Sequence, residues 1–218
     1  MKVDYWHNFQ EGLFYHIYNH SSGEKNLFGN DHDYQDFLAK YNRYFSTLFD
    51  TYAYCLMPNH FHLIVQVRKK EMILAQINTA ESSASLALYH NQTSLNEYIQ
   101  DQFRRYFSSY TLAYNHRNKT RGQLFLKRMK RISFDPDAKL AYLICYAHHN
   151  PIHHRFAKSY EIWKYSSYQF YCHNEPAAIE NMKRADEFIS RDAERMHHQF
   201  RMDRAYEVHT NGDSYTLE

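Results

Sequence analysis

The stretch YCLMPNHFHLIV, residues 54–65, decides which fold this chain can adopt. Its apolar runs, 51–56 and 60–67, flank a Met-Pro-Asn turn and therefore predict two strands joined by a short connection. Side chains alternate across a strand, so His60 and His62 project from the same face of the second strand. Two imidazoles on one face are half of a metal site, or alternatively two hydrogen-bonded histidines on a sheet.

Further strands and helices are predicted on both sides of this hairpin. Periodicity and turn residues indicate strands at 14–20, 51–56, 60–67 and 123–134, and helices at 33–49, from 95 onward and at 137–149. Residues 71–93 give no definite pattern, and 176–218 predict an amphipathic helix with a polar end. The order strand, helix, strand, strand, helix, strand, helix predicts an α+β fold: an antiparallel sheet with helices packed on one side, plus a C-terminal helical tail.

A capping box marks the start of the second long helix. Ser94 and Glu97 stand three residues apart, so each side chain can satisfy a free backbone N–H of the other residue. The apolar stripe that follows consists of Leu95, Ile99, Phe103, Tyr106 and Tyr110. Its helical spacing predicts that this face belongs to the core.

Composition excludes several classes of protein. The chain of 218 residues has five glycines, none followed by lysine, and contains no GxGxxG or GxSxG motif. A phosphate-binding P-loop, a dinucleotide fold and a nucleotide cofactor are therefore not expected. Three cysteines without a CxxC pair and the lack of a long apolar run predict a cytoplasmic protein with no membrane partner.

Charge is unevenly distributed, although the formal net charge is only +2. Residues 71–175 hold thirteen bases and eight acids, or +5, whereas 176–218 hold six bases and nine acids, or −3. One segment contains only basic charges: Arg117, Lys119, Arg121, Lys127, Arg128, Lys130 and Arg131. They predict a surface for the phosphates of a nucleic-acid backbone, and a solvated charged face is the alternative.

A second candidate group lies near the end of the last predicted helix. Tyr146 and Asn150 are four residues apart and therefore on the same side of that helix. A helix laid across the sheet would bring a phenol and an amide oxygen towards the histidine pair. The alternative is that Tyr146 is a buried aromatic side chain beside a helix end. The chain has 21 tyrosines, so composition alone does not single out Tyr146.

Four blocks occur in an order that resembles the HUH single-tyrosine transposases, in particular the REP-associated branch. The blocks are YHIYN at 15–19, residues 54–65, YAHHNP at 146–151 and WKYSSY at 163–168. The resemblance covers about residues 12–172 and implies a ferredoxin-like fold. It implies that His60, His62 and Asn150 hold a metal and that Tyr146 is the nucleophile. The doubled His148-His149 departs from the usual pattern, so His149 becomes a competing ligand.

The resemblance also implies a function. Residues 1–175 are expected to be a catalytic domain that cleaves and rejoins single-stranded DNA beside hairpins through a 5′-phosphotyrosine intermediate, with Mg²⁺ or Mn²⁺ as cofactor. The basic residues of the segment 117–131, together with Arg104 and Arg105, are expected to bind the DNA phosphates. Residues 176–218 are expected to be an acidic tail without an assigned role, and the protein to be a monomer or homodimer. Three alternatives stay open: a DNA-binding protein that has lost cleavage, a small-molecule metallohydrolase and a replication-type nickase.

Overall fold

The computed structural model describes residues 4–77, 83–173, 175–185, 189 and 193–211. Its sheet consists of β1 (Phe14–His20), β2 (Phe49–Met57), β3 (His60–Val67) and β4 (Lys130–Phe134). The strands lie in the order β2-β3-β1-β4, and each neighbouring pair is antiparallel. The predicted hairpin is thus confirmed as β2 and β3, and the α+β fold with an antiparallel sheet is confirmed as well.

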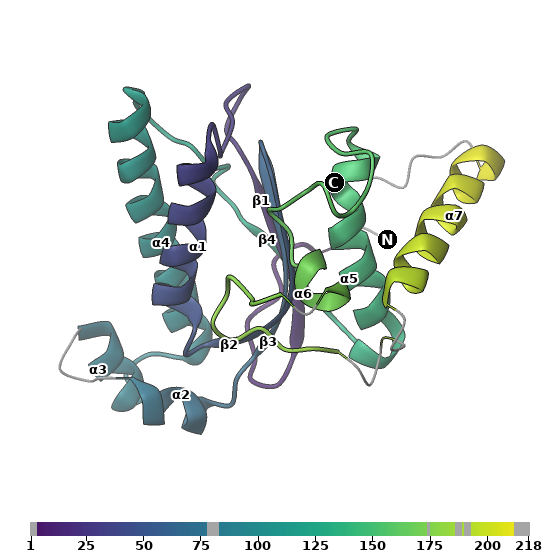
Figure 1. The fold of residues 1–218 in the computed structure, drawn as a ribbon. Coiled ribbons are helices and arrows are strands. Elements are labelled where there is room, and N and C mark those ends of the chain that lie inside the picture. Colours follow the sequence, from purple (N-terminus) through teal and green to yellow (C-terminus); the bar gives the residue numbers. More distant parts are fainter. Residues whose placement is uncertain (1–3, 78–82, 174, 186–188, 190–192, 212–218) are drawn as a thin grey trace.

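Helices surround this sheet (Figure 1). Within the described residues they are α1 (Asp31–Phe45), α2 (Lys70–Gln76), α3 (Ser83–Tyr89), α4 (Leu95–Asn118), α5 (Pro136–His153), α6 (Tyr168–Cys172) and α7 (Ala193–Asn211). The predicted capping box is confirmed at α4: Ser94 Oγ accepts from Glu97 N, and Glu97 accepts from Ser94 N. The segment without a definite pattern contains α2 and α3. None of the helices in the described part of the chain has the length and apolar character that crossing a membrane requires.

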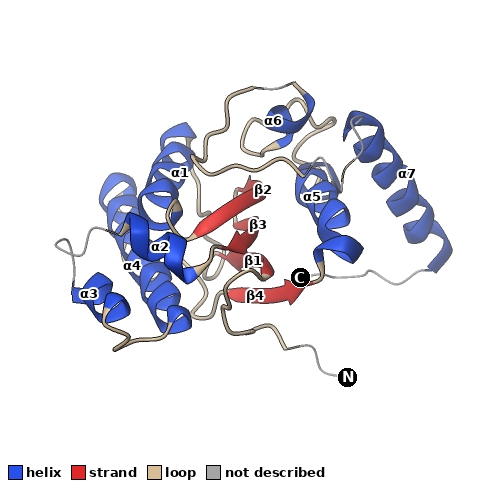
Figure 2. Cartoon of the chain, turned by 90° about the horizontal axis from the view of Figure 1, so that it is seen from below, coloured by secondary structure: helices blue, strands red, loops and turns tan. Residues whose placement is uncertain are grey.

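The prediction that helices pack on one side of the sheet was wrong for α5. Figure 2 shows α1 and α4 on one face and α5 on the other. The helices α1 and α4 each connect two strands that run in the same direction, and right-handed crossovers bring them to the same face. Because α5 follows the last strand, it makes no crossover and covers the opposite face, where Ile144 packs with Ile64.

The predicted strand at 123–134 is shorter than expected. Only Lys130–Phe134 joins the sheet, and the residues before it form a loop held to the end of β1. Leu126 N donates to His20 O at 2.9 Å, and Ser22 N donates to Leu124 O at 2.7 Å. These bonds give the loop an isolated bridge between Phe125 and Ser21, the residue after β1, in place of a ladder.

The predicted helix at 137–149 continues past its expected end. Pro151 lies inside α5, which runs on to His153. Proline lacks a backbone N–H, so one intrahelical hydrogen bond is lost here without ending the helix.

The C-terminal region contributes to both cores. Ile179 packs in the core beneath α1 and α4, and Ala185 packs in the core beneath α5. Thr51 N donates to Asn181 O at 2.8 Å, which fixes this segment beside β2. The predicted helix of the tail is α7, which packs against α5; the last part of the tail, 212–218, lies outside the described residues.

Candidate active site

Histidines and a tyrosine gather at one end of the sheet, on the face that α5 covers. The register pairs Tyr18 with His62 and His20 with His60 across β1 and β3. Directly opposed residues in an antiparallel pair lie on the same face, and so does His16, two residues before Tyr18. The imidazole rings of His20 and His60 stack with centroids 4.6 Å apart. The histidine pair thus belongs to a larger cluster.

The helix α5 presents Tyr146 and Asn150 to this cluster. The Tyr146 ring meets His62 edge to face, with centroids 5.5 Å apart, and meets His16 at 5.9 Å. Asn150 Nδ2 donates to Tyr146 O at 2.8 Å, which leaves the amide oxygen of Asn150 for other contacts. The structure therefore brings together the predicted nucleophile and the predicted histidines, which lie on different elements.

Each histidine of the pair is oriented by a neighbour through its Nδ1 atom. His60 Nδ1 lies 2.8 Å from Asn59 Oδ1, and His62 Nδ1 lies 2.9 Å from His16 Nε2. The Nε2 atom of His60 is buried and has no hydrogen-bond partner in the described structure. Histidines that bind metals characteristically use their second nitrogen in such a contact. This orphaned lone pair is what a metal ligand requires.

Burial keeps these imidazoles neutral. It lowers the pKa of His60 to about 3. The neighbouring His20 and His154 also lower this pKa, whereas the side chain of Asn150 raises it. Burial also lowers the pKa of His62 well below its ordinary value, and the neighbouring His16 adds to the shift. Only the neutral imidazole binds a metal ion, so the pair is held in its ligand form.

The residues at this site could supply nitrogen and oxygen donors to a divalent cation. Among the described residues, no three His, Cys, Asp or Glu side chains are placed to hold a metal ion. The residues that could hold a metal ion here are those that the resemblance implied, namely the imidazoles of His60 and His62 and the amide oxygen of Asn150. Such a mixed nitrogen and oxygen set suits Mn²⁺ better than Mg²⁺ and leaves positions open.

The predicted competitor, His149, is directed away from this site. Its Nδ1 atom lies 3.2 Å from Tyr160 Oη, and its ring meets that of Phe200 from α7. The adjacent His148 contacts His197 and Ser167 at 2.6 and 2.7 Å. These contacts tie α5 to α7, so the alternative of His149 as a metal ligand is not supported.

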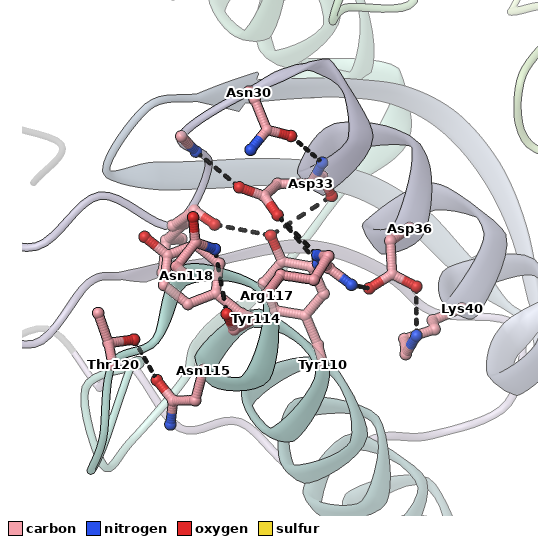
Figure 3. A network of polar contacts seen from close by, with 12 residues as sticks. Asn30, Asp33, Asp36, Lys40, Tyr110, Tyr114, Asn115, Arg117, Asn118 and Thr120 are labelled. Carbon is pink, nitrogen blue, oxygen red and sulfur yellow. Dashed lines mark hydrogen bonds and ion pairs between the residues drawn. The ribbon is translucent and has the colours of Figure 1, made fainter.

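Two of the predicted DNA-binding arginines have structural partners instead. Arg117 Nη2 donates to the fully buried Asp33 at 2.9 Å, and Arg117 Nη1 donates to Asp36 at 2.9 Å (Figure 3). Arg131 is only 8% exposed and its Nε donates to His7 O at 2.7 Å. The ion pairs with two carboxylates give Arg117 a structural role, and its predicted contact with DNA stays a prediction.

The remaining predicted bases differ in how strongly they are engaged. Arg104 and Arg105 both pair with Asp101 on the surface of α4. Lys130 Nζ lies over the rings of Tyr5 and Tyr18, at 4.8 and 5.2 Å. Lys119, Arg121, Lys127 and Arg128 are exposed as well, and the guanidinium of Arg128 lies over the ring of Trp6 at 5.2 Å.

Sequence reasoning missed Asn59, His16, His20 and Tyr18 as parts of the site. The alternation of His16, Tyr18 and His20 along one strand was a usable signal, since it predicts a shared face. Which face they share depends on the pairing of β1 with β3, and no local pattern specifies that pairing.

Comparison with known proteins supports the fold. No protein-family model matches the chain, and no curated protein matches it. Among solved structures, the chain is similar to a REP-associated tyrosine transposase bound to a REP hairpin, with a TM-score of 0.52 and 14% sequence identity. The match covers 84% of this chain and 96% of that chain. The two proteins therefore share a fold, as the resemblance in sequence implied.

Proposed function

We propose that this protein is a single-stranded DNA endonuclease and strand transferase of the HUH tyrosine type that acts beside hairpin DNA. The observation that carries the proposal is the contact between the Tyr146 ring of α5 and the His62 ring of β3. A nucleophile and a pair of neutral imidazoles are what a metal-assisted phosphoryl transfer to tyrosine needs. The solved structure with the similar fold holds a REP hairpin, which supports a hairpin as partner.

In the proposed reaction, Tyr146 Oη attacks a phosphorus atom of the DNA backbone and loses its proton to water. The bond from phosphorus to the 3′ oxygen breaks, and that oxygen takes up a proton. The products are a 5′-phosphotyrosine and a free 3′ hydroxyl. A second hydroxyl can reverse the step, because the covalent bond retains the energy of the phosphodiester.

The site residues would have separate tasks in this reaction. His60, His62 and Asn150 would hold Mg²⁺ or Mn²⁺, which polarises the scissile phosphate when it is bound. Asn59 and His16 orient the two imidazoles. The helix α5 carries both Tyr146 and Asn150, so the nucleophile and a ligand move as one unit.

A second candidate function is DNA binding without cleavage. One observation favours it: Tyr146 is only 6% exposed and shares a small apolar cluster with Phe200 of α7. A nucleophile so covered can serve as a structural side chain. The two functions differ in whether a covalent intermediate forms.

The decisive experiment uses a labelled single-stranded hairpin oligonucleotide with Mn²⁺. The parent protein should form an adduct that survives denaturing electrophoresis, and Tyr146→Phe should abolish it while binding persists. Tyr142→Phe is the matched control, because Tyr142 lies one turn earlier on α5 and is 42% exposed. An adduct that still forms in Tyr146→Phe would show that Tyr146 is not the nucleophile. If the parent protein forms no adduct, the second candidate function, DNA binding without cleavage, is favoured.

A further inference from the structure

A groove of about 810 Å³ runs between α4 and the loop that precedes β4. The helix α4 lies on the face of the sheet opposite α5 (Figure 2). The α4 residues that line the groove recur every three or four positions from Gln100 to Asn115, so they lie on one face of the helix. The opposite wall is the segment 122–129. Asn19 Nδ2 donates to Leu126 O at 3.2 Å and fixes this wall to β1.

The groove combines exposed apolar side chains with positive charge. Leu112, Leu126 and Trp6 line it and are 69%, 46% and 41% exposed. Lys127 and Arg128 also line it and are exposed, whereas none of the described residues in its walls is acidic. Exposed apolar side chains gathered in a concave site favour an interaction surface, and a rim with only positive charge favours an anionic partner.

We propose that this groove binds unpaired nucleotides of single-stranded DNA, a proposal that rests on the proposed function and deepens it. Unpaired bases would lie against the apolar wall, and their phosphates would contact Lys127 and Arg128. A duplex hides its bases and presents phosphates, so it would make no use of exposed leucines and a tryptophan. Single strands present both surfaces at once.

The position of the groove relative to the candidate active site supports this assignment. Asn19 lines the groove, and the next residue, His20, points to the other face and stacks on His60. The edge strand β4 repeats this alternation: Arg131 lines the groove, whereas Lys130 pairs with Tyr18 on the histidine face. A strand of DNA that leaves the groove would thus pass a basic edge before it reaches Tyr146.

The test compares two labelled hairpins, one with a single-stranded extension and one blunt, by fluorescence anisotropy in a Tyr146→Phe background. Ser108→Trp should fill the groove, because Ser108 lines it and is exposed. We expect affinity for the extended hairpin to fall at least ten-fold and affinity for the blunt hairpin to stay unchanged. The matched control is His116→Trp, an exposed position of α4 outside the groove.

A second pair of variants avoids added volume, in case Ser108→Trp does not fold. Lys127→Ala should reduce both the affinity for the extended hairpin and the slope of its salt dependence, by about 0.7 for one lost phosphate contact. Lys139→Ala, at an exposed position of α5 outside the groove, should leave this slope unchanged.

Each contrary outcome has a distinct meaning. Equal losses for the blunt and extended hairpins would assign the groove to the duplex stem and overturn the proposal. No loss for either hairpin would overturn it too, and competition by an acidic peptide alone would assign the groove to a protein partner. If no covalent adduct forms but Ser108→Trp still discriminates between the hairpins, the groove proposal stands and the nuclease proposal falls.

Discussion

His16 Nε2 and His62 Nδ1 lie 2.9 Å apart across β1 and β3. Both rings are buried, at 3% and 2% exposure, so water does not compete for this contact. The contact fixes the ring of His62 and directs its other nitrogen into the cluster. Hydrogen bonds of this kind orient a histidine that binds a metal ion and raise its basicity.

We therefore expect His16→Phe to weaken Mn²⁺ binding by about 10- to 100-fold. Phenylalanine fills the space of the imidazole but cannot hydrogen-bond to His62. Isothermal titration calorimetry measures the affinity directly, and His16→Gln, which retains an amide, should lose less than His16→Phe. The exposed His116→Phe serves as control. Unchanged affinity in His16→Phe would show that His62 needs no such support.

The buried histidines predict that the fold loses stability in mild acid. Burial lowers the pKa of His16 and of His60 to about 3, against about 6.5 for a free side chain. Below about pH 6.5 these histidines bind protons in the unfolded chain, whereas in the folded chain they stay neutral until about pH 3. The free energy of unfolding should therefore fall as the pH decreases through this window, by about 1.4 kcal/mol per pH unit for each such histidine.

Urea unfolding at pH 7, 6 and 5 measures this slope. His16→Phe should reduce it by the contribution of one histidine, whereas His116→Phe should leave it unchanged because His116 is exposed. A slope that is the same in His16→Phe and in the parent protein would mean that His16 takes up its proton equally in both states.

Local sequence patterns predicted most strands and helices of the fold, but they did not predict its long-range contacts. The hairpin of β2 and β3 and the capping box at Ser94 are encoded within a few residues, and both were predicted. The face of the sheet that α5 covers was not predicted. The strands β1 and β3 are buried on both faces, so they lack the alternation of apolar and polar residues that marks a solvent-exposed face. The sheet partner of each strand is likewise set by packing across the whole chain.

The candidate site shows the same division. His60 and His62 are two residues apart, and Tyr146 and Asn150 are one helical turn apart, so each pair was predicted from spacing. The meeting of the two pairs depended on the resemblance to a family, since composition does not single out Tyr146. Counting charges did not reveal the ion pair of Arg117, because its partner Asp33 lies 84 residues away in the sequence.

Arg117 should matter for stability and not for DNA binding. Arg117→Ala would leave the carboxylate of Asp33 buried without its cation, although Gly29 N still donates to it at 2.9 Å. We expect a loss of about 3 kcal/mol in the free energy of unfolding, measured in urea. Lys119→Ala, two residues on and exposed, should change it by less than about 0.5 kcal/mol. If Arg117→Ala folds and its DNA affinity depends less steeply on salt, Arg117 contacts DNA phosphates after all.

Tyr18 combines a cost in stability with a place in the candidate site. Its hydroxyl is buried and has no hydrogen-bond partner in the described structure, and its ring centroid lies 5.7 Å from that of His62. Burial raises the pKa of Tyr18, so the hydroxyl stays protonated and available as a donor. A buried polar group without a partner costs about 1–3 kcal/mol. Native proteins keep such groups mainly where function needs them.

Tyr18→Phe should therefore move stability and activity in opposite directions. Removal of the unpaired hydroxyl should leave the free energy of unfolding unchanged or raise it by about 1 kcal/mol. Loss of a donor beside the reacting phosphate should slow adduct formation by about ten-fold or more, measured under single-turnover conditions. The control is Tyr89→Phe on α3, where the side chain is 53% exposed. A less stable Tyr18→Phe protein would reveal a partner for the hydroxyl, and an unchanged rate would show that Tyr18 does not reach the DNA.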